Sequence, residues 1–205
     1  MNISDKDKKN EQKVYVAGSV SGFFLEIVKI FLMAIFIILP IRMFLFQPFF
    51  VQGASMEPNF EDGQYLIVNE FGYKKTDLGF FTVEPKKNLE RGEVVVFRYP
   101  RDHRVFFIKR IIGLPGEKIK ISDGKIVIYN KKNPNGFTLA EPYLPKNIKT
   151  LGDIDYQIKS DEYFVLGDNR MHSSDSRIWG PVKKQEIIGR VFLRAWPLDK
   201  VAIFK

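Results

Sequence analysis

Three short segments of the sequence carry side chains that are suited to acyl-transfer chemistry. The first is Gln52-Gly53-Ala54-Ser55-Met56-Glu57-Pro58. Small residues before Ser55 leave its hydroxyl accessible to an extended peptide, and they let backbone N–H groups approach a developing oxyanion. Most serines between Gly, Ala and Pro are simply turn residues, however. The segment becomes a candidate nucleophile only if a base lies within hydrogen-bond reach of the hydroxyl.

Lys109 is the strongest candidate for that base. It lies in Val105–Gly113, an otherwise apolar segment. On the inward face of a strand its amine would be desolvated, which lowers the pKa of a lysine toward neutral pH. Alternation along the strand equally allows Lys109 to face solvent and Arg110 to face inward. The sequence does not choose between these two orientations.

The two histidines are weaker candidates for the base. His103 lies in a charged turn, Arg101–Arg104, and His172 lies in a polar loop. Both are predicted to be surface residues.

The third segment, Gly167–Pro181, follows a predicted strand and is dense in short polar side chains. One interpretation is a solvated loop that is held by its own Asx turns. The other is a polar wall that orients a lysine and ties strands together through an Asp–Arg pair.

A long apolar stretch precedes all three segments. Residues 23–46 reach the roughly 17–25 residues that a membrane-spanning helix needs. Lysines are frequent before this stretch, whereas residues 47–70 contain no Lys or Arg. The positive-inside rule then predicts a cytoplasmic tail at 1–22, an anchor at 23–46 and an external domain at 47–205. The alternatives are a cleavable signal peptide ending near Val51-Gln52-Gly53 and a buried core helix.

The external domain is predicted to be mainly β, because short β-branched and aromatic runs alternate with turn residues and no amphipathic helix interrupts them. Asp123-Gly124 predicts a two-residue hairpin turn that pairs Ile121 with Ile126 and Ile119 with Ile128. Residues 118–160, of which the part from 129 is rich in Asn, Pro, Lys and Gly, are interpreted as a cap insertion. The predicted strands are Tyr65–Asn69, Glu93–Arg98, Val105–Ile112, Tyr163–Leu166, Ile187–Arg194 and Val201–Phe204.

Composition removes several classes of function. The 205 residues include no cysteine and only two histidines, which excludes thiolate chemistry and argues against a multi-histidine metal centre. No metal or cofactor is therefore predicted. The net charge of +8 comes from scattered Lys doublets, which favours a solvated basic surface, then contact with anionic lipid, and lastly nucleic-acid binding.

Taken in order behind the apolar stretch, the three segments resemble those of bacterial type I signal peptidases, the serine proteases that cleave leader peptides. Two weaker stretches, Asp62–Tyr73 and Arg91–Phe97, also resemble family segments. The matching residues are Gly53–Pro58, Lys109–Glu117, Gly167-Asp168-Asn169, Ser173, Asp175-Ser176-Arg177 and Trp179-Gly180.

The resemblance implies a role for each matched residue. Ser55 would be the nucleophile, and Lys109 the general base. Ser173 would hydrogen-bond the lysine amine, and Asp175 with Arg177 would form an ion pair that braces the site. The remaining supporting positions are Met56, beneath the dyad, and Asp168 and Asn169.

One position departs from the family pattern. Gly53 stands where some members carry a serine whose hydroxyl helps to hold the oxyanion. The backbone N–H of Ser55 is then the one oxyanion donor that the resemblance identifies. Losing such a donor typically costs about 2.7–4 kcal/mol, so a compensating group is expected.

The resemblance also implies a fold, a substrate and a location. The fold would be mainly β, with the cap inserted between the lysine and Gly-Asp-Asn segments. The substrates would be signal peptides of exported preproteins, bound extended with small side chains one and three residues before the cut. Lipid and the export machinery would be partners, and the catalytic domain would lie on the outer face of the bacterial plasma membrane. Pro48–Phe50 and Phe80-Phe81 would hold the site at the bilayer surface, or Phe80-Phe81 would pack in the core.

Four other functions are alternatives to this one. The first is a peptidase dedicated to one cargo, such as a pilus or conjugation subunit. The second is a catalytically silent, membrane-anchored assembly factor. A self-cleaving repressor would need a DNA-binding helix pair in place of the apolar stretch. A basic nucleic-acid-binding β-barrel would show binding that falls steeply with salt.

Overall fold

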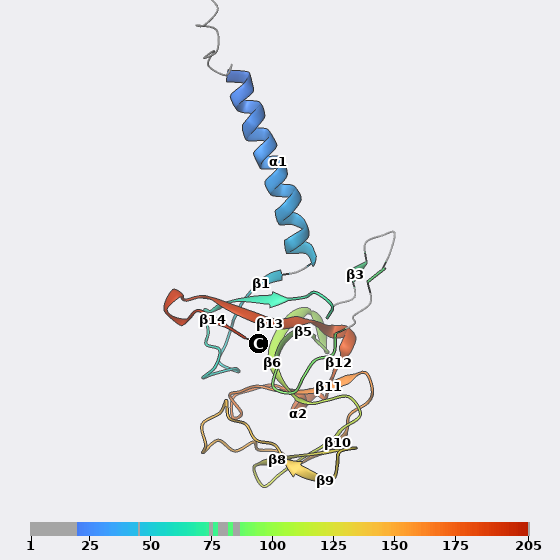
Figure 1. Ribbon diagram of the computed structural model, residues 1–205. Helices are drawn as coiled ribbons and strands as arrows, with labels where there is room; N and C mark the ends of the chain where they lie inside the picture. Colours follow the sequence, from blue (N-terminus) through green and yellow to red (C-terminus); the bar gives the residue numbers. More distant parts are fainter. Residues whose placement is uncertain (1–19, 45, 74–75, 78–81, 84–86, 205) are drawn as a thin grey trace, which may run out of the picture. The chain divides into compact units, whose positions relative to one another are not determined.

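The computed structural model describes residues 20–44, 46–73, 76–77, 82–83 and 87–204 (Figure 1). The chain divides into two compact units, residues 1–42 and 43–205. Helix α1 (Val20–Phe44) exposes most of its large apolar side chains between Phe23 and Ile38. Among the residues that the structure describes, no helix combines the length and apolarity needed to cross a membrane.

Two sequence predictions are affected at this end of the chain. The anchor was predicted to extend through Phe46, but Phe46 begins strand β1 (Phe46–Phe50), where it pairs with Asn69. Residues 1–19 of the predicted cytoplasmic tail lie outside the described part of the chain, and so does Phe80-Phe81.

An antiparallel sheet forms the main scaffold of the second unit. Its strand order is β1-β2-β13-β5-β6-β11-β12, with β14 added beside β13. Long strand β6 (Asp102–Gly113) lies between β5 and β11, and several bulges along β13 and β11 curve the sheet. The other strands are β2 (Tyr65–Asn69), β5 (Val94–Tyr99), β11 (Glu162–Leu166), β12 (Val182–Lys183), β13 (Ile187–Trp196) and β14 (Ala202–Ile203).

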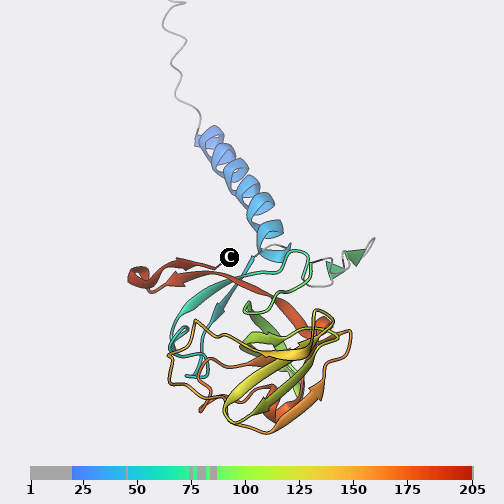
Figure 2. The same cartoon turned by 60° about the horizontal axis from the view of Figure 1, so that its bottom comes forward.

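A smaller sheet, of order β10-β7-β8-β9, is built from residues 118–157 and packs against the first (Figure 2). Its strands are β7 (Lys118–Ser122), β8 (Lys125–Asn130), β9 (Asn133–Thr138) and β10 (Ile154–Gln157). Asp123 and Gly124 both have positive φ, and the predicted isoleucine pairs form across this turn. One apolar cluster joins the sheets, because Ile119 and Ile128 pack with Ile112 and Phe164.

The predicted strands correspond to observed ones, with ends that differ by up to three residues. The prediction that no amphipathic helix interrupts the strands holds for the described residues, where the one α-helix within the strand series is α2 (Ser176–Trp179), a single turn of four residues. The Asp175 side chain caps this helix by accepting a hydrogen bond from the Arg177 N–H. The remaining elements are the pair β3 (Thr76–Asp77) and β4 (Thr82–Val83), and the 3₁₀ turns η2 (Lys184–Glu186) and η3 (Leu198–Lys200).

Candidate active site

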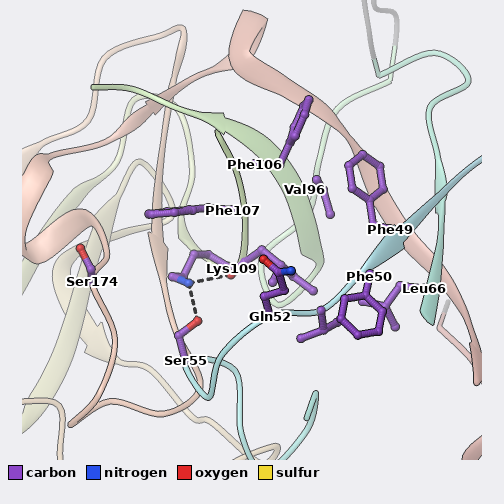
Figure 3. Close-up of a pocket in the computed structure, with 12 residues that line it drawn as sticks. Phe49, Phe50, Gln52, Ser55, Leu66, Val96, Phe106, Phe107, Lys109 and Ser174 are labelled. Atoms are coloured by element: carbon purple, nitrogen blue, oxygen red, sulfur yellow. Dashed lines mark hydrogen bonds between the residues drawn. The ribbon is translucent and has the colours of Figure 1, made fainter. Parts of the chain in front are cut away.

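The structure brings Ser55 and Lys109 into direct contact. Ser55 lies in the loop between β1 and β2, and Lys109 lies near the middle of β6. Lys109 Nζ is 2.7 Å from Ser55 Oγ and 2.8 Å from the carbonyl oxygen of Ile108, and it donates to both (Figure 3). The Lys109 residue is only 3% exposed.

Burial changes the protonation of this lysine. It lowers the pKa of Lys109 from 10.5 to about 8, although the carboxylates of Asp175 and Asp168 act in the opposite direction. About one tenth of the protein would therefore carry a neutral amine at pH 7. A neutral amine 2.7 Å from a hydroxyl is able to accept its proton.

The neighbouring residue, Arg110, is also buried. Its Nε and Nη2 donate to the two carboxylate oxygens of Asp168 at 2.8 and 2.5 Å, and its Nη1 donates to the Gly92 carbonyl at 2.7 Å. The sequence had left open which of the two basic residues faces inward. Both do, because Lys109 bonds to Ser55 while Arg110 bonds to Asp168 and to the Gly92 carbonyl.

The segment after β11 supports the Ser55 loop directly. The Asn169 backbone N–H donates to the Ser55 carbonyl at 3.1 Å, and the Asn169 side-chain amide donates to the Ala54 carbonyl at 3.0 Å. Gly167 packs against the same loop, since a Cβ added to it would lie 2.4 Å from the Ser55 carbonyl oxygen and 2.2 Å from Ser173 Oγ. Sequence reasoning missed this requirement for glycine; a Gly at the end of a buried strand is the signal that indicates close backbone approach.

Asp175 and Arg177 form an ion pair behind this segment. Arg177 Nε and Nη2 each lie 2.8 Å from an oxygen of the fully buried Asp175 carboxylate. Asp175 also accepts the Gly167 N–H at 3.1 Å. The pair therefore fixes the strand end from which Gly167 and Asn169 reach the Ser55 loop.

Ser173 does not make the hydrogen bond that the resemblance implies. Its hydroxyl is buried and has no hydrogen-bond partner in the described part of the chain. The amine of Lys109 instead directs its bonds to Ser55 and to the Ile108 carbonyl. Met56 is fully buried with Phe60 and Leu66 in one apolar cluster.

The remaining candidates from the sequence lie away from the contact or are occupied. His103 and His172 are both exposed, and His103 lies 3.4 Å from Glu186. The Gly53 N–H donates to Asp62 Oδ1 at 2.6 Å, so it is not free to serve as a second oxyanion donor. Across the described residues, no three Asp, Glu or His side chains gather in a way that would hold a metal ion.

An apolar cleft of about 200 Å³ leads to the hydroxyl–amine contact. Phenylalanines from β1 and β6 form its walls, and Figure 3 shows Phe49 and Phe106 on the side away from Ser55. The lining residues with polar side chains are Gln52, Ser55, Lys109 and Ser174. The apolar lining is Phe49, Phe50, Val51, Leu66, Val96, Phe106, Phe107 and Ile108.

A serine hydroxyl next to a buried lysine amine, at the end of an apolar cleft on a β scaffold, is the arrangement expected of a serine peptidase with a lysine base. The sequence model of one such family, described as signal peptidase, peptidase S26, matches residues 24–196. The chain belongs to this family, and it is accordingly a serine endopeptidase.

Individual relatives agree with this membership. Signal peptidase I T of Bacillus subtilis (strain 168) is 33% identical, over 95% of this chain and 97% of the relative. Signal peptidase I of Pseudomonas fluorescens is 32% identical, over 85% of this chain and 74% of the relative. A solved signal peptidase I from Enterococcus faecalis V583 is 32% identical and covers 51% of this chain, with a TM-score of 0.43, which is too low to compare the folds.

Proposed function

We propose that this protein removes N-terminal signal peptides from exported preproteins, with Ser55 as the nucleophile and Lys109 as the general base. The observation that carries the proposal is the 2.7 Å contact between Lys109 Nζ and Ser55 Oγ, made by a lysine whose pKa is lowered to about 8. The family relationship supports the same reaction, since the relatives are named signal peptidases.

The proposed reaction has two proton transfers in each half. Neutral Lys109 takes the Ser55 proton as Oγ attacks the scissile carbonyl, and the resulting ammonium gives that proton to the leaving amine. A water then attacks the acyl-enzyme while Lys109 takes a proton from it, and the proton returns to Ser55 as the ester breaks. The Ser55 N–H is proposed to hold the oxyanion in both halves.

The cleft is suited to an extended peptide with small apolar side chains. Strand β1 is at the edge of the large sheet, so a substrate strand can add to its free side. The limited volume of about 200 Å³ next to Ser55 favours small side chains close to the cut. The apolar walls favour the hydrophobic part of a leader sequence.

We also propose that the apolar stretch that begins at residue 23 and ends before β1 anchors the protein in the bacterial plasma membrane, close to the export machinery. The support is the apolar sequence, its basic N-terminal flank and the exposed apolar side chains of α1. Side chains of residues 39–45 lie outside the described part. In this proposal residues 47–205 form the external peptidase domain, with 118–160 as its cap.

The test is cleavage of a preprotein with an Ala-x-Ala site by the full chain in detergent. Ser55→Ala and Lys109→Ala should each abolish turnover. Lys118→Ala is the matched control, because it removes an exposed lysine that pairs with Asp155 and lies over the Tyr129 ring, far in sequence from both Ser55 and Gly167. His103→Ala/His172→Ala should retain nearly full activity, and activity that survives in Lys109→Ala would remove the proposed base.

A further inference from the structure

A second polar network connects the loop between β9 and β10 with the segment that supports Ser55. We propose that Glu141 and Tyr143 in this loop are positioning residues. They hold Gly167–Asn169 in the place from which it fixes the main chain of Ser55. The inference rests on the proposed function, because it names residues that align the proposed nucleophile.

Arg170 is the central contact of this network. Its side chain is completely buried, so its charge needs a close partner. Glu141 provides that partner with both carboxylate oxygens, one of which lies 2.8 Å from Arg170 Nη1. The Thr150 hydroxyl accepts a further bond from Nη1. Arg170 Nε donates to the Gly167 carbonyl at 3.0 Å, which joins the loop to the supporting segment.

Tyr143 links this pair to the neighbouring ion pair. Its hydroxyl donates to Glu141 Oε1 at 2.6 Å, and its ring centroid lies 4.0 Å from the Arg110 guanidinium. The Tyr143 carbonyl accepts a bond from Asn59, whose amide also donates to Asp168. Burial and the adjacent Glu141 carboxylate raise the pKa of Tyr143 well above 10, so the hydroxyl remains a donor throughout the pH range of the reaction.

Gly167 and Asp168 are thereby held in place, and the adjacent Asn169 in turn holds the nucleophile. Arg170 holds the Gly167 carbonyl, and Arg110 and Asn59 hold Asp168. Asn169 passes this placement on to Ser55 through the 3.1 Å bond to the Ser55 carbonyl. A displacement of about 1 Å at a reacting atom costs about 100-fold in rate, so a partial loosening should lower kcat by a smaller factor.

The test compares two Tyr→Phe variants of the full chain that lose the same kind of bond. Tyr143→Phe removes the hydroxyl bond to Glu141 and keeps the ring against Arg110. Tyr156→Phe is the control, since its hydroxyl, on β10 of the small sheet, donates to Glu162 at 3.0 Å, at the end of β11 opposite to Gly167–Asn169. Tyr143→Phe is expected to lower kcat about three- to tenfold with KM unchanged, and Glu141→Gln about tenfold or more. Tyr156→Phe should leave kcat within about twofold of the wild type.

The pH profile separates positioning from general loosening. If Glu141 and Tyr143 position Ser55, the kcat/KM of Tyr143→Phe and Glu141→Gln is lower than that of the wild type at every pH. The pH at which kcat/KM rises stays near 8, because Lys109 remains buried in these variants. A loosened fold would instead hydrate the lysine and move that rise to higher pH, which would overturn the inference. The fold-decrease in kcat of the double variant Tyr143→Phe/Glu141→Gln should be smaller than the product of the two single decreases, since both changes act through the Glu141 carboxylate. A decrease equal to that product would also overturn the inference.

The outcomes distinguish this inference from the proposed function. Cleavage by the wild type that disappears in Ser55→Ala, together with equal kcat values for Tyr143→Phe and Tyr156→Phe, rejects the positioning role alone. A wild type that does not cleave the preprotein, or cleavage that survives in Ser55→Ala, rejects the proposed function and the positioning role with it.

Discussion

Replacing Lys109 by Met should change the pH dependence of stability by an amount that follows from the burial of the amine. Burial lowers the pKa of Lys109 from 10.5 to about 8. At 1.36 kcal/mol per pH unit, keeping the ammonium in the folded protein at pH 7 costs about 3 kcal/mol. Met has a similar length and no charge, so Lys109→Met removes this cost. The variant also loses the hydrogen bonds to Ser55 and Ile108, at about 1 kcal/mol each. The free energy of unfolding of Lys109→Met at pH 7 should therefore be about 1 kcal/mol higher than that of the wild type.

The direction of the pH effect follows from where the proton is bound. Below pH 8 Lys109 is charged in both states, and the folded state carries the whole cost. Between about pH 8 and 10.5 the unfolded chain binds the proton and the folded protein does not, so the stability of the wild type rises with pH. Across this window the wild type should gain about 3 kcal/mol relative to Lys109→Met.

The assay is urea unfolding of the full chain in detergent, followed by tryptophan fluorescence at several pH values from 7 to 10.5. Other titrating groups cancel when the variant is subtracted from the wild type. Lys118→Met is the control, because its amine is exposed beside Asp155. Parallel curves for the wild type and Lys109→Met across this range would show that the amine is not desolvated, and the argument for a neutral base would fail.

Three further predictions concern the same site. The kcat/KM of the wild type should rise with pH and reach half its maximum near pH 8, where Lys109 loses its proton; a midpoint near 6.5 would point to a histidine base instead. Gly167→Ala should lower kcat about 100-fold because the added Cβ would overlap the Ser55 loop. Gly116→Ala is the control: Gly116 has a φ of +79 and no atom within 4 Å of an added Cβ, so the change should cost about 1 kcal/mol of stability without loss of kcat. Asp175→Asn should destabilise the fold by about 3–5 kcal/mol in urea unfolding, since it leaves Arg177, whose side chain is 11% exposed, without its carboxylate partner. It should also shift the kcat/KM midpoint to lower pH.

Local sequence signals predicted the elements whose structure depends on local chemistry. The Asp123-Gly124 turn forms because both residues adopt positive φ, and the paired isoleucines follow from that turn. Strands β9 and β10 were missed within residues 129–160, since both are edge strands of the small sheet. An edge strand tolerates the Pro and Gly of β9, so its sequence lacks the usual strand pattern. Its position depends on pairing with β8, which no local pattern shows.

The candidate site was predictable in its chemistry and in the Asp175–Arg177 pair, but not in the contacts that the β9–β10 loop makes. The residue types around Ser55 and Lys109 indicate a nucleophile and a base without any coordinates. Alternation along β6 suggested that one of two adjacent basic residues must face solvent. That expectation assumes a strand with one solvent-exposed face, whereas β6 is buried on both faces from Lys109 to Gly113. Glu141 and Tyr143 lie in a loop with no periodicity, and their role depends on contacts with residues distant in sequence.

Burial explains how a lysine near two buried carboxylates can lose its proton. Asp168 and Asp175 both favour the ammonium form of Lys109 and oppose the effect of burial. Each carboxylate, however, forms a two-point ion pair with its own arginine, Asp168 with Arg110 and Asp175 with Arg177. Burial is the largest influence on the amine and outweighs both carboxylates, so the pKa of Lys109 falls to about 8 and the amine is able to lose its proton near neutral pH.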